Sequence, residues 1–132
     1  MINDFRGLSQ QEPCTVLVVE DEPLVRFMVA EELRDSGMRV IEAGSADEAL
    51  ERLRAGNPVD FVFADIELPG SMNGLELARR VQADFPNLEF LMTSGRAPAH
   101  DAASRRPFIP KPYDVAEVID RIRAALDVTG AA

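Results

Sequence analysis

The chain has 132 residues, of which 46% are hydrophobic, and its formal net charge is −9. This length suits one domain with its own core, and the acidic balance disfavours direct binding to nucleic acid. No run approaches the roughly 18 consecutive apolar residues of a membrane-spanning helix, and the first residues lack a secretory pattern. Cys14 is the single cysteine, which excludes an internal disulfide and a thiolate zinc cluster. We therefore expect a soluble, cytoplasmic protein without membrane insertion.

Residues 1–13 are polar and show no periodicity, which predicts an N-terminal tail. Residues 15–19 are almost wholly apolar and rich in valine, which is typical of a strand buried on both faces. Pro23 suits the first turn of the helix that follows, and this helix is expected to end before Gly37. This helix carries the large apolar residues Leu24, Phe27, Met28 and Leu33.

The alternation of strand and helix continues through the middle of the chain. A strand is expected at residues 38–43, followed by a helix that Ser45 caps, with Glu48 completing a capping box. A third strand is expected at residues 59–64, and Asn73 can cap the next helix.

Two more strands are expected in the last third of the chain, at residues 88–92 and 108–109. Asp114 suits the N-cap of a final helix. Residues 96–106, between these strands, include no large apolar residue that could dock a helix on the core. We therefore expect a weak or mobile fourth helix there.

The strict alternation predicts an α/β domain over residues 14–127, with a C-terminal tail at residues 128–132. Parallel strands with right-handed crossovers place helices on both faces of the sheet. In such a sheet, ligands bind at the carboxyl ends of the strands. Side chains that can bind a phosphoryl group or a metal stand at four expected strand ends, which predicts that they meet in one pocket: Glu20, Asp21, Asp65, Thr93 and Lys111.

Asp65 is the candidate nucleophile, because a carboxylate can accept a phosphoryl group as an acyl phosphate. Two of these carboxylates about 4 Å apart would repel by on the order of 4 kcal/mol, so a divalent cation is expected. Mg²⁺ suits the set because it binds few carboxylates and keeps several waters. We assign Asp21 and Asp65 as direct ligands, Glu20 as a ligand through water, and the backbone carbonyl of Glu67 as a further oxygen.

Lys111 and Thr93 complete the predicted site. Lys111 supplies a positive charge for one phosphoryl oxygen, and the Thr93 hydroxyl can donate a hydrogen bond to another. Thr93 could move toward Asp65 when the phosphoryl group arrives, which would make the site a switch.

Four motifs follow one another in the chain: Glu20-Asp21-Glu22 after the first strand, Asp65-Ile66-Glu67-Leu68-Pro69, Thr93-Ser94-Gly95 and Lys111-Pro112-Tyr113. With these motifs, residues 14–127 resemble the receiver domain of two-component response regulators. The resemblance implies a flavodoxin-like three-layer fold with five parallel strands in the order 2-1-3-4-5. It also implies the role of each site residue: phosphoacceptor Asp65, acidic pair Glu20 and Asp21, switch hydroxyl Thr93, phosphoryl-binding Lys111 and switch aromatic Phe108.

The resemblance further implies a phosphorylation-dependent signalling switch. The phosphoryl donor would be a sensor histidine kinase or a histidine phosphotransfer protein, and the output would be binding to a downstream protein that the sequence does not identify. We expect no enzymatic activity beyond the formation and hydrolysis of the chain's own acyl phosphate, and a monomer or weak homodimer. The starting methionine favours a complete single-domain regulator over a receiver detached from a larger protein.

The loop after Asp65 departs from the family pattern, because residues 69–74 are one residue longer and have Asn73 where Asp is common. This change leaves the phosphoryl lifetime open and keeps a binding-only receiver as an alternative. A second alternative is a Mg²⁺-dependent phosphohydrolase with an aspartate nucleophile. Such enzymes place a second Asp where this chain has Glu67, and the chain has no sizeable cap domain.

Overall fold

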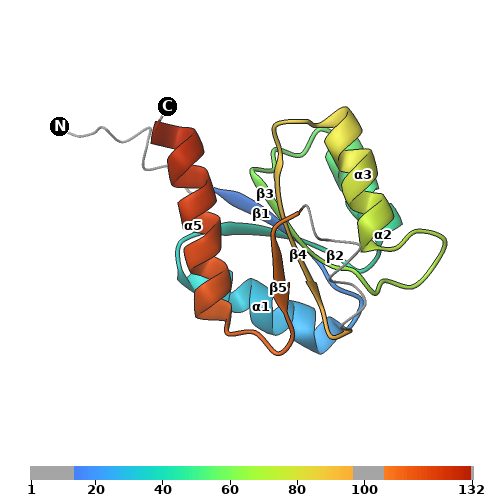
Figure 1. Cartoon of the computed structure of the whole chain (residues 1–132), viewed down its shortest axis with the longest axis horizontal. Helices are drawn as coiled ribbons and strands as arrows, with labels where there is room; N and C mark the ends of the chain where they lie inside the picture. The colour runs from blue at the N-terminus through green and yellow to red at the C-terminus, as the bar shows by residue number, and fades with distance from the viewer. Residues whose placement is uncertain (1–13, 97–105, 132) are drawn as a thin grey trace.

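A parallel sheet of five strands forms the middle layer of the structure (Figure 1), a computed structural model that describes residues 14–96 and 106–131. The strands stand in the order β2-β1-β3-β4-β5, and all neighbouring strands are parallel. This order confirms the predicted flavodoxin-like fold. The strands are β1 (Thr15–Val19), β2 (Arg39–Ala43), β3 (Phe61–Asp65), β4 (Glu89–Ser94) and β5 (Phe108–Pro110).

Helices cover both faces of the sheet, with α1 and α5 on one face and α2 and α3 on the other (Figure 1). Leu17 and Val19 of β1 pack with α2 and α3, whereas Val16 and Val18 pack with α1 and α5. β1 is therefore buried on both faces, as its apolar run predicts. Of the helices in the described part, none combines the length and apolar character needed to cross a membrane. The helices are α1 (Pro23–Asp35), α2 (Ala46–Arg54), α3 (Gly74–Asp84) and α5 (Val115–Ala131).

Side-chain caps begin three of these helices, as predicted. Ser45 accepts a hydrogen bond from the Glu48 amide at 3.1 Å, while the Glu48 carboxylate accepts one from the Gly44 amide at 2.7 Å. The bond from Gly44, one residue before the usual partner in a capping box, lowers the pKa of Glu48. Asn73 and Asp114 likewise accept hydrogen bonds from backbone amides in the first turns of α3 and α5.

Several predicted boundaries were wrong. β2 and β3 begin later than expected, and β4 continues to Ser94. Asp65 and Thr93 lie within their strands instead of after them, because β3 and β4 stay paired as far as these two residues. α5 continues to Ala131, into the segment predicted as a tail, because extending an existing helix adds a hydrogen bond for each residue ordered.

Two predictions fall on residues that the structure does not describe. The predicted N-terminal tail at residues 1–13 lies outside the described residues. Nearly all of the predicted fourth helix, residues 97–105, lies outside them as well.

The first residue of α3 packs directly against the strand end that carries Asp65. The Gly74 amide donates a hydrogen bond to the Ile66 carbonyl at 2.9 Å. A Cβ atom on Gly74 would lie 2.3 Å from the carbonyl oxygen of Asp65 and 2.8 Å from the Cα of Ile66. Met72, in the longer loop just before α3, is 4% exposed and belongs to the core. The longer loop is therefore anchored at its end, and only glycine fits at position 74.

The Gly74→Ala variant should lose about 1–3 kcal/mol of unfolding free energy, the usual cost of overpacking, because backbone atoms at Asp65 and Ile66 must move. Urea unfolding would measure the loss. The matched control is Gly95→Ala, whose added methyl group would lie 3.9 Å from the Lys111 side chain, an ordinary contact. Equal stability of the two variants would contradict the close approach of α3 to β3.

Candidate functional site

Asp65 lies at the end of β3 with 4% of its surface exposed. Its two carboxylate oxygens have different partners. The Nζ of Lys111 donates a hydrogen bond to Oδ2 at 2.6 Å, and the Glu67 amide donates one to Oδ1 at 2.9 Å. The fold thus brings together Asp65 and Lys111, which lie 46 residues apart in the sequence.

Glu20, the residue after β1, is buried beside this pair, with 5% of its surface exposed. Its Oε1 lies 3.6 Å from the Nζ of Lys111, and its Oε2 accepts a hydrogen bond from the Glu22 amide at 3.1 Å. Burial raises the pKa of Glu20, and the Asp65 charge and a hydrogen bond with Asp21 add to the increase. The Glu22 amide and the Lys111 charge oppose it without cancelling it. The predicted acidic residues are therefore neighbours, although Asp21 is exposed.

Lys111 carries the positive charge that these carboxylates need. Burial by itself would lower the pKa of Lys111, but the hydrogen bond to Asp65 and the charges of Asp65 and Glu20 outweigh burial, so this pKa is raised. The ammonium group is therefore charged at neutral pH and lies next to two buried carboxylates.

Thr93 lies opposite Asp65 in the pairing of β3 with β4. It is 2% exposed, and within the described residues its hydroxyl is a buried group without a hydrogen-bond partner. Buried polar groups normally have partners, because an unpaired one costs free energy. A hydroxyl in this state suits the predicted role of Thr93 as a donor to a phosphoryl oxygen.

Phe108 stands at the start of β5, where it pairs with Met92 of β4. Its ring packs partly buried against Met92, Ile66 and Ala78. The backbone carbonyl of Phe108 accepts a hydrogen bond from Arg121 of α5 at 3.1 Å. Phe108 thus packs against residues of β4 and α3, and its role as a switch aromatic stays a prediction.

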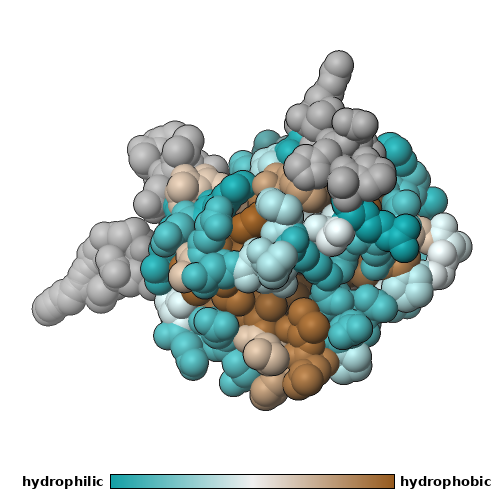
Figure 2. Space-filling view, turned by 60° about the horizontal axis from the view of Figure 1, so that its bottom comes forward, coloured by the Kyte–Doolittle hydropathy of each residue, from teal (hydrophilic) through white to brown (hydrophobic). Residues whose placement is uncertain are grey.

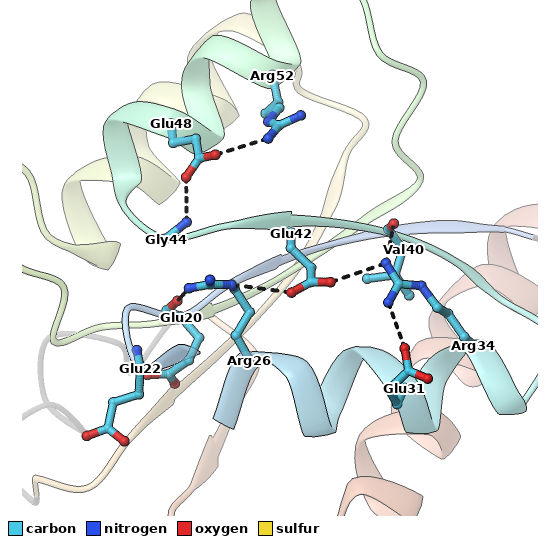
Figure 3. Close-up of polar contacts among 10 residues, drawn as sticks. All are labelled: Glu20, Glu22, Arg26, Glu31, Arg34, Val40, Glu42, Gly44, Glu48 and Arg52. Carbon is cyan, nitrogen blue, oxygen red and sulfur yellow. Dashed lines mark hydrogen bonds and ion pairs between the residues drawn. The ribbon is translucent and has the colours of Figure 1, made fainter. Parts of the chain in front are cut away.

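Sequence reasoning missed Arg26, which reaches the acidic loop from α1 (Figure 3). Its guanidinium donates to the backbone carbonyl of Glu20 at 2.8 Å and to the Glu42 carboxylate of β2 at 3.3 Å. Arg34 of α1 donates to the other oxygen of Glu42 at 3.3 Å. α1 is therefore tied to β2 and to the first acidic residue of the site. The sequence does show an arginine soon after the acidic loop. Its position in the sequence, however, does not reveal that it binds Glu20 and Glu42.

Tyr113 was also missed as a residue of the site. Its ring packs edge-on against Phe63, with ring centroids 5.3 Å apart. Burial, and then the charge of Glu20, raise the pKa of Tyr113 to about 12. The pKa of the Tyr113 phenol therefore depends on the charges of the carboxylates around Lys111.

The oxygen donors at this edge of the sheet fit Mg²⁺. Glu20 and Asp65 supply buried carboxylates, Asp21 lies beside them, and Mg²⁺ typically binds one or two carboxylates and several waters. In residues 14–96 and 106–131, no three His, Cys, Asp or Glu side chains form a ready metal-binding group. Backbone oxygen and water would therefore complete the coordination, as the assignment of the Glu67 carbonyl assumes.

The fold and the site together define a class of protein. The protein is a doubly wound parallel α/β domain, with buried carboxylates and a lysine at the carboxyl ends of its strands. Residues 16–123 match the response regulator receiver domain family. The chain belongs to this family, which confirms the resemblance seen in its motifs.

Curated relatives include regulators and kinases much longer than this chain. The chain is 34% identical over 124 residues to the probable transcriptional regulatory protein TcrX of Mycobacterium tuberculosis, a match that covers 90% of this chain and 52% of TcrX. It is 35% identical over 121 residues to the sensor kinase CckA of Brucella abortus, covering 86% of this chain and 12% of CckA. The chain thus spans about half or less of these relatives.

Solved structures with a similar fold include response regulator chains that the match covers almost completely. The response regulator receiver protein from Sinorhizobium medicae is 28% identical, with a TM-score of 0.81, and the match covers 89% of this chain and 97% of that chain. The response regulator TrrA from Thermotoga maritima, solved in complex with Mg(2+)-BeF, is 26% identical, with a TM-score of 0.77. That match covers 85% of this chain and 98% of TrrA.

Tyr113 should titrate at about pH 12 in the folded chain, above the ordinary value of about 10. Near-ultraviolet absorbance would measure this directly, because the chain has one tyrosine and no tryptophan. The Glu20→Gln variant should titrate at lower pH, since one charge that disfavours the phenolate is gone, whereas Glu51→Gln should behave as wild type. Circular dichroism at each pH would check that the chain stays folded. Titration of folded wild type near pH 10 would contradict the described environment.

Proposed function

We propose that the chain is a phosphorylation-dependent signalling switch that accepts a phosphoryl group on Asp65 from a phosphohistidine. The donor is a sensor histidine kinase or a histidine phosphotransfer protein. The observation that carries the proposal is the buried Asp65 carboxylate, which accepts a hydrogen bond from Lys111 at 2.6 Å. Asp65 also pairs in the sheet with Thr93, whose hydroxyl has no partner in the described residues. A nucleophile, a cation and a free donor are the groups that phosphoryl transfer needs.

In the proposed reaction, a carboxylate oxygen of Asp65 attacks the phosphorus atom of the phosphohistidine. The new bond joins oxygen to phosphorus, the bond from phosphorus to the imidazole nitrogen breaks, and that nitrogen keeps the electron pair. Lys111 neutralises charge on one phosphoryl oxygen, and the Thr93 hydroxyl donates to another. Lys111 thus exchanges a carboxylate for a phosphoryl oxygen, while Thr93 gains the partner that it lacks.

Asp21, Asp65, the Glu67 carbonyl and, through water, Glu20 are the proposed ligands of Mg²⁺. When bound, this ion neutralises part of the phosphoryl charge and of the carboxylate repulsion. The complex of the related TrrA with Mg(2+)-BeF supports this cofactor. The chain's own part is to hold these oxygens at one edge of the sheet.

We further propose that the donor protein docks on α1. Leu24, Phe27 and Met28 of this helix are 69%, 54% and 55% exposed. Figure 2 shows apolar side chains gathered on the face where α1 lies. A groove of about 440 Å³ beside Met28 is also lined by Lys111 and Tyr113, and Lys111 binds Asp65. A protein bound to this surface would hold its phosphohistidine near the phosphoacceptor.

The output of the switch is proposed to be protein binding after Thr93 and Phe108 respond to the phosphoryl group. The same site could also hydrolyse its own acyl phosphate. The chemistry that we propose therefore acts on the chain itself. A phosphohydrolase acting on other substrates is disfavoured because Glu67 stands where such enzymes have a second Asp. Glu67 is moreover bonded to Ser94 through its side chain.

Acetyl phosphate with Mg²⁺ should add one phosphoryl group to the wild-type chain, and the Asp65→Asn variant should add none, because an amide is not a nucleophile for this transfer. Intact-mass spectrometry would measure the adduct. The control is Asp47→Asn, an exposed position on α2 that should be labelled as wild type is. Equal labelling of Asp65→Asn, or labelling that does not need Mg²⁺, would contradict the proposal. A wild-type chain that takes no phosphoryl group would favour the binding-only receiver.

The Phe27→Glu variant should accept phosphoryl groups about tenfold more slowly from a phosphorylated histidine kinase, because a charge replaces an apolar contact at the interface. Its labelling by acetyl phosphate should not change, since that donor needs no docking surface. The kinase would be one that labels the wild-type chain. Ala83→Glu, an exposed position on α3 at the other face of the sheet, is the control. Equal kinase rates for the two variants would contradict docking on α1.

A further inference from the structure

Two residues beside the phosphoacceptor bind each other across the ends of β3 and β4. The Ser94 hydroxyl donates a hydrogen bond to Oε2 of Glu67 at 2.5 Å. The same hydroxyl accepts a hydrogen bond from the Arg96 amide at 2.9 Å. Ser94 is 2% exposed, so this bridge is buried on the Ser94 side. Its hydroxyl is satisfied as donor and acceptor, in contrast to the hydroxyl of its neighbour Thr93.

Both ends of this bridge are attached to the site. The Glu67 amide donates a hydrogen bond to Oδ1 of Asp65 at 2.9 Å, while the Glu67 carboxylate accepts the hydrogen bond from Ser94. Ser94 follows Thr93 in β4, and its carbonyl accepts a hydrogen bond from the Lys111 amide at 2.9 Å. The Glu67–Ser94 bridge therefore connects the loop after the phosphoacceptor with the strand end that carries Thr93.

A phosphoryl group on Asp65 would act on this bridge in two ways. It would add negative charge close to the Glu67 carboxylate, and like charges repel more strongly where water is partly excluded. It would also attract the Thr93 hydroxyl, which lacks a partner. Because Thr93 and Ser94 are consecutive residues, a shift of Thr93 toward Asp65 also displaces Ser94 relative to Glu67.

We propose that Glu67 and Ser94 form a latch that holds residues 93–96 in the unphosphorylated arrangement, and that phosphorylation of Asp65 opens it. The inference rests on the proposed function. Glu67 is then a positioning residue that acts through Ser94 and opposes phosphorylation, because the latch must open before Thr93 can bind the phosphoryl group. The Arg96 amide, which loses its fixed acceptor, is the first group beyond the site to change.

A double-mutant cycle tests the latch. Glu67→Ala and Ser94→Ala should each be labelled by acetyl phosphate with Mg²⁺ about tenfold faster than wild type, the rate ratio expected when a hydrogen bond to a charged group no longer has to break. The double variant should be no faster than the faster single variant. Effects that multiply in the double variant would show that Glu67 and Ser94 act independently and would overturn the latch. Rates within about twofold of wild type for either single variant would overturn it as well.

Amide hydrogen exchange gives a second readout that needs no phosphoryl donor. In the unphosphorylated Glu67→Ala variant, the Arg96 amide should exchange about tenfold faster than in wild type, although the acceptor of this amide is the Ser94 hydroxyl and not Glu67. Glu51→Ala, at an exposed position on α2, should leave this exchange unchanged. An unchanged Arg96 amide in Glu67→Ala would overturn the coupling through Ser94.

The two readouts separate failure of the latch from failure of the proposed function. If wild type gains no phosphoryl group on Asp65, the proposed function fails, and the exchange measurement alone then decides whether Glu67 holds Ser94 and Arg96. If wild type is labelled but neither variant changes rate or exchange, the proposed function stands and the latch is wrong.

Discussion

The ion pair between Lys111 and Asp65 is the interaction on which the rest of the site depends. Asp65 and Glu20 are both buried, and burying a charged carboxylate without a partner costs free energy. Lys111 lies 2.6 Å from one and 3.6 Å from the other. It thereby lets the fold hold both buried carboxylates at one edge of the sheet, and it ties β3 to the end of β5.

Two hydroxyl groups near this ion pair differ in their hydrogen bonds. Ser94 is held on both sides, by Glu67 and by the Arg96 amide, whereas the adjacent Thr93 hydroxyl has no partner in the described part of the chain. At the end of β4, the hydroxyl of Ser94 therefore has its hydrogen bonds, whereas the hydroxyl of Thr93 lacks one. This combination suits the proposed response of the site to a phosphoryl group.

α1 serves the site on two sides. Towards the sheet, Arg26 binds the Glu20 carbonyl and the Glu42 carboxylate, which places the acidic loop (Figure 3). Towards solvent, the helix exposes large apolar residues beside the groove that leads to Lys111 (Figure 2). A partner on the exposed side of α1 would therefore lie close to both the proposed phosphoacceptor and the acidic pair, because one helix carries both surfaces.

The sequence by itself determined the alternation of elements, the caps at Ser45 and Asn73, and the meeting of Asp65 with Lys111. Burial of a strand on both faces requires a continuous apolar run, caps act within one turn, and parallel strands end at the same edge. Only the tertiary structure decided that Leu33 is buried while Phe27 is exposed, since both are apolar residues of one helix and packing selects the buried side. It also decided the contacts of Arg26 and Glu67, because strand register and helix placement, not spacing along the chain, bring those partners together.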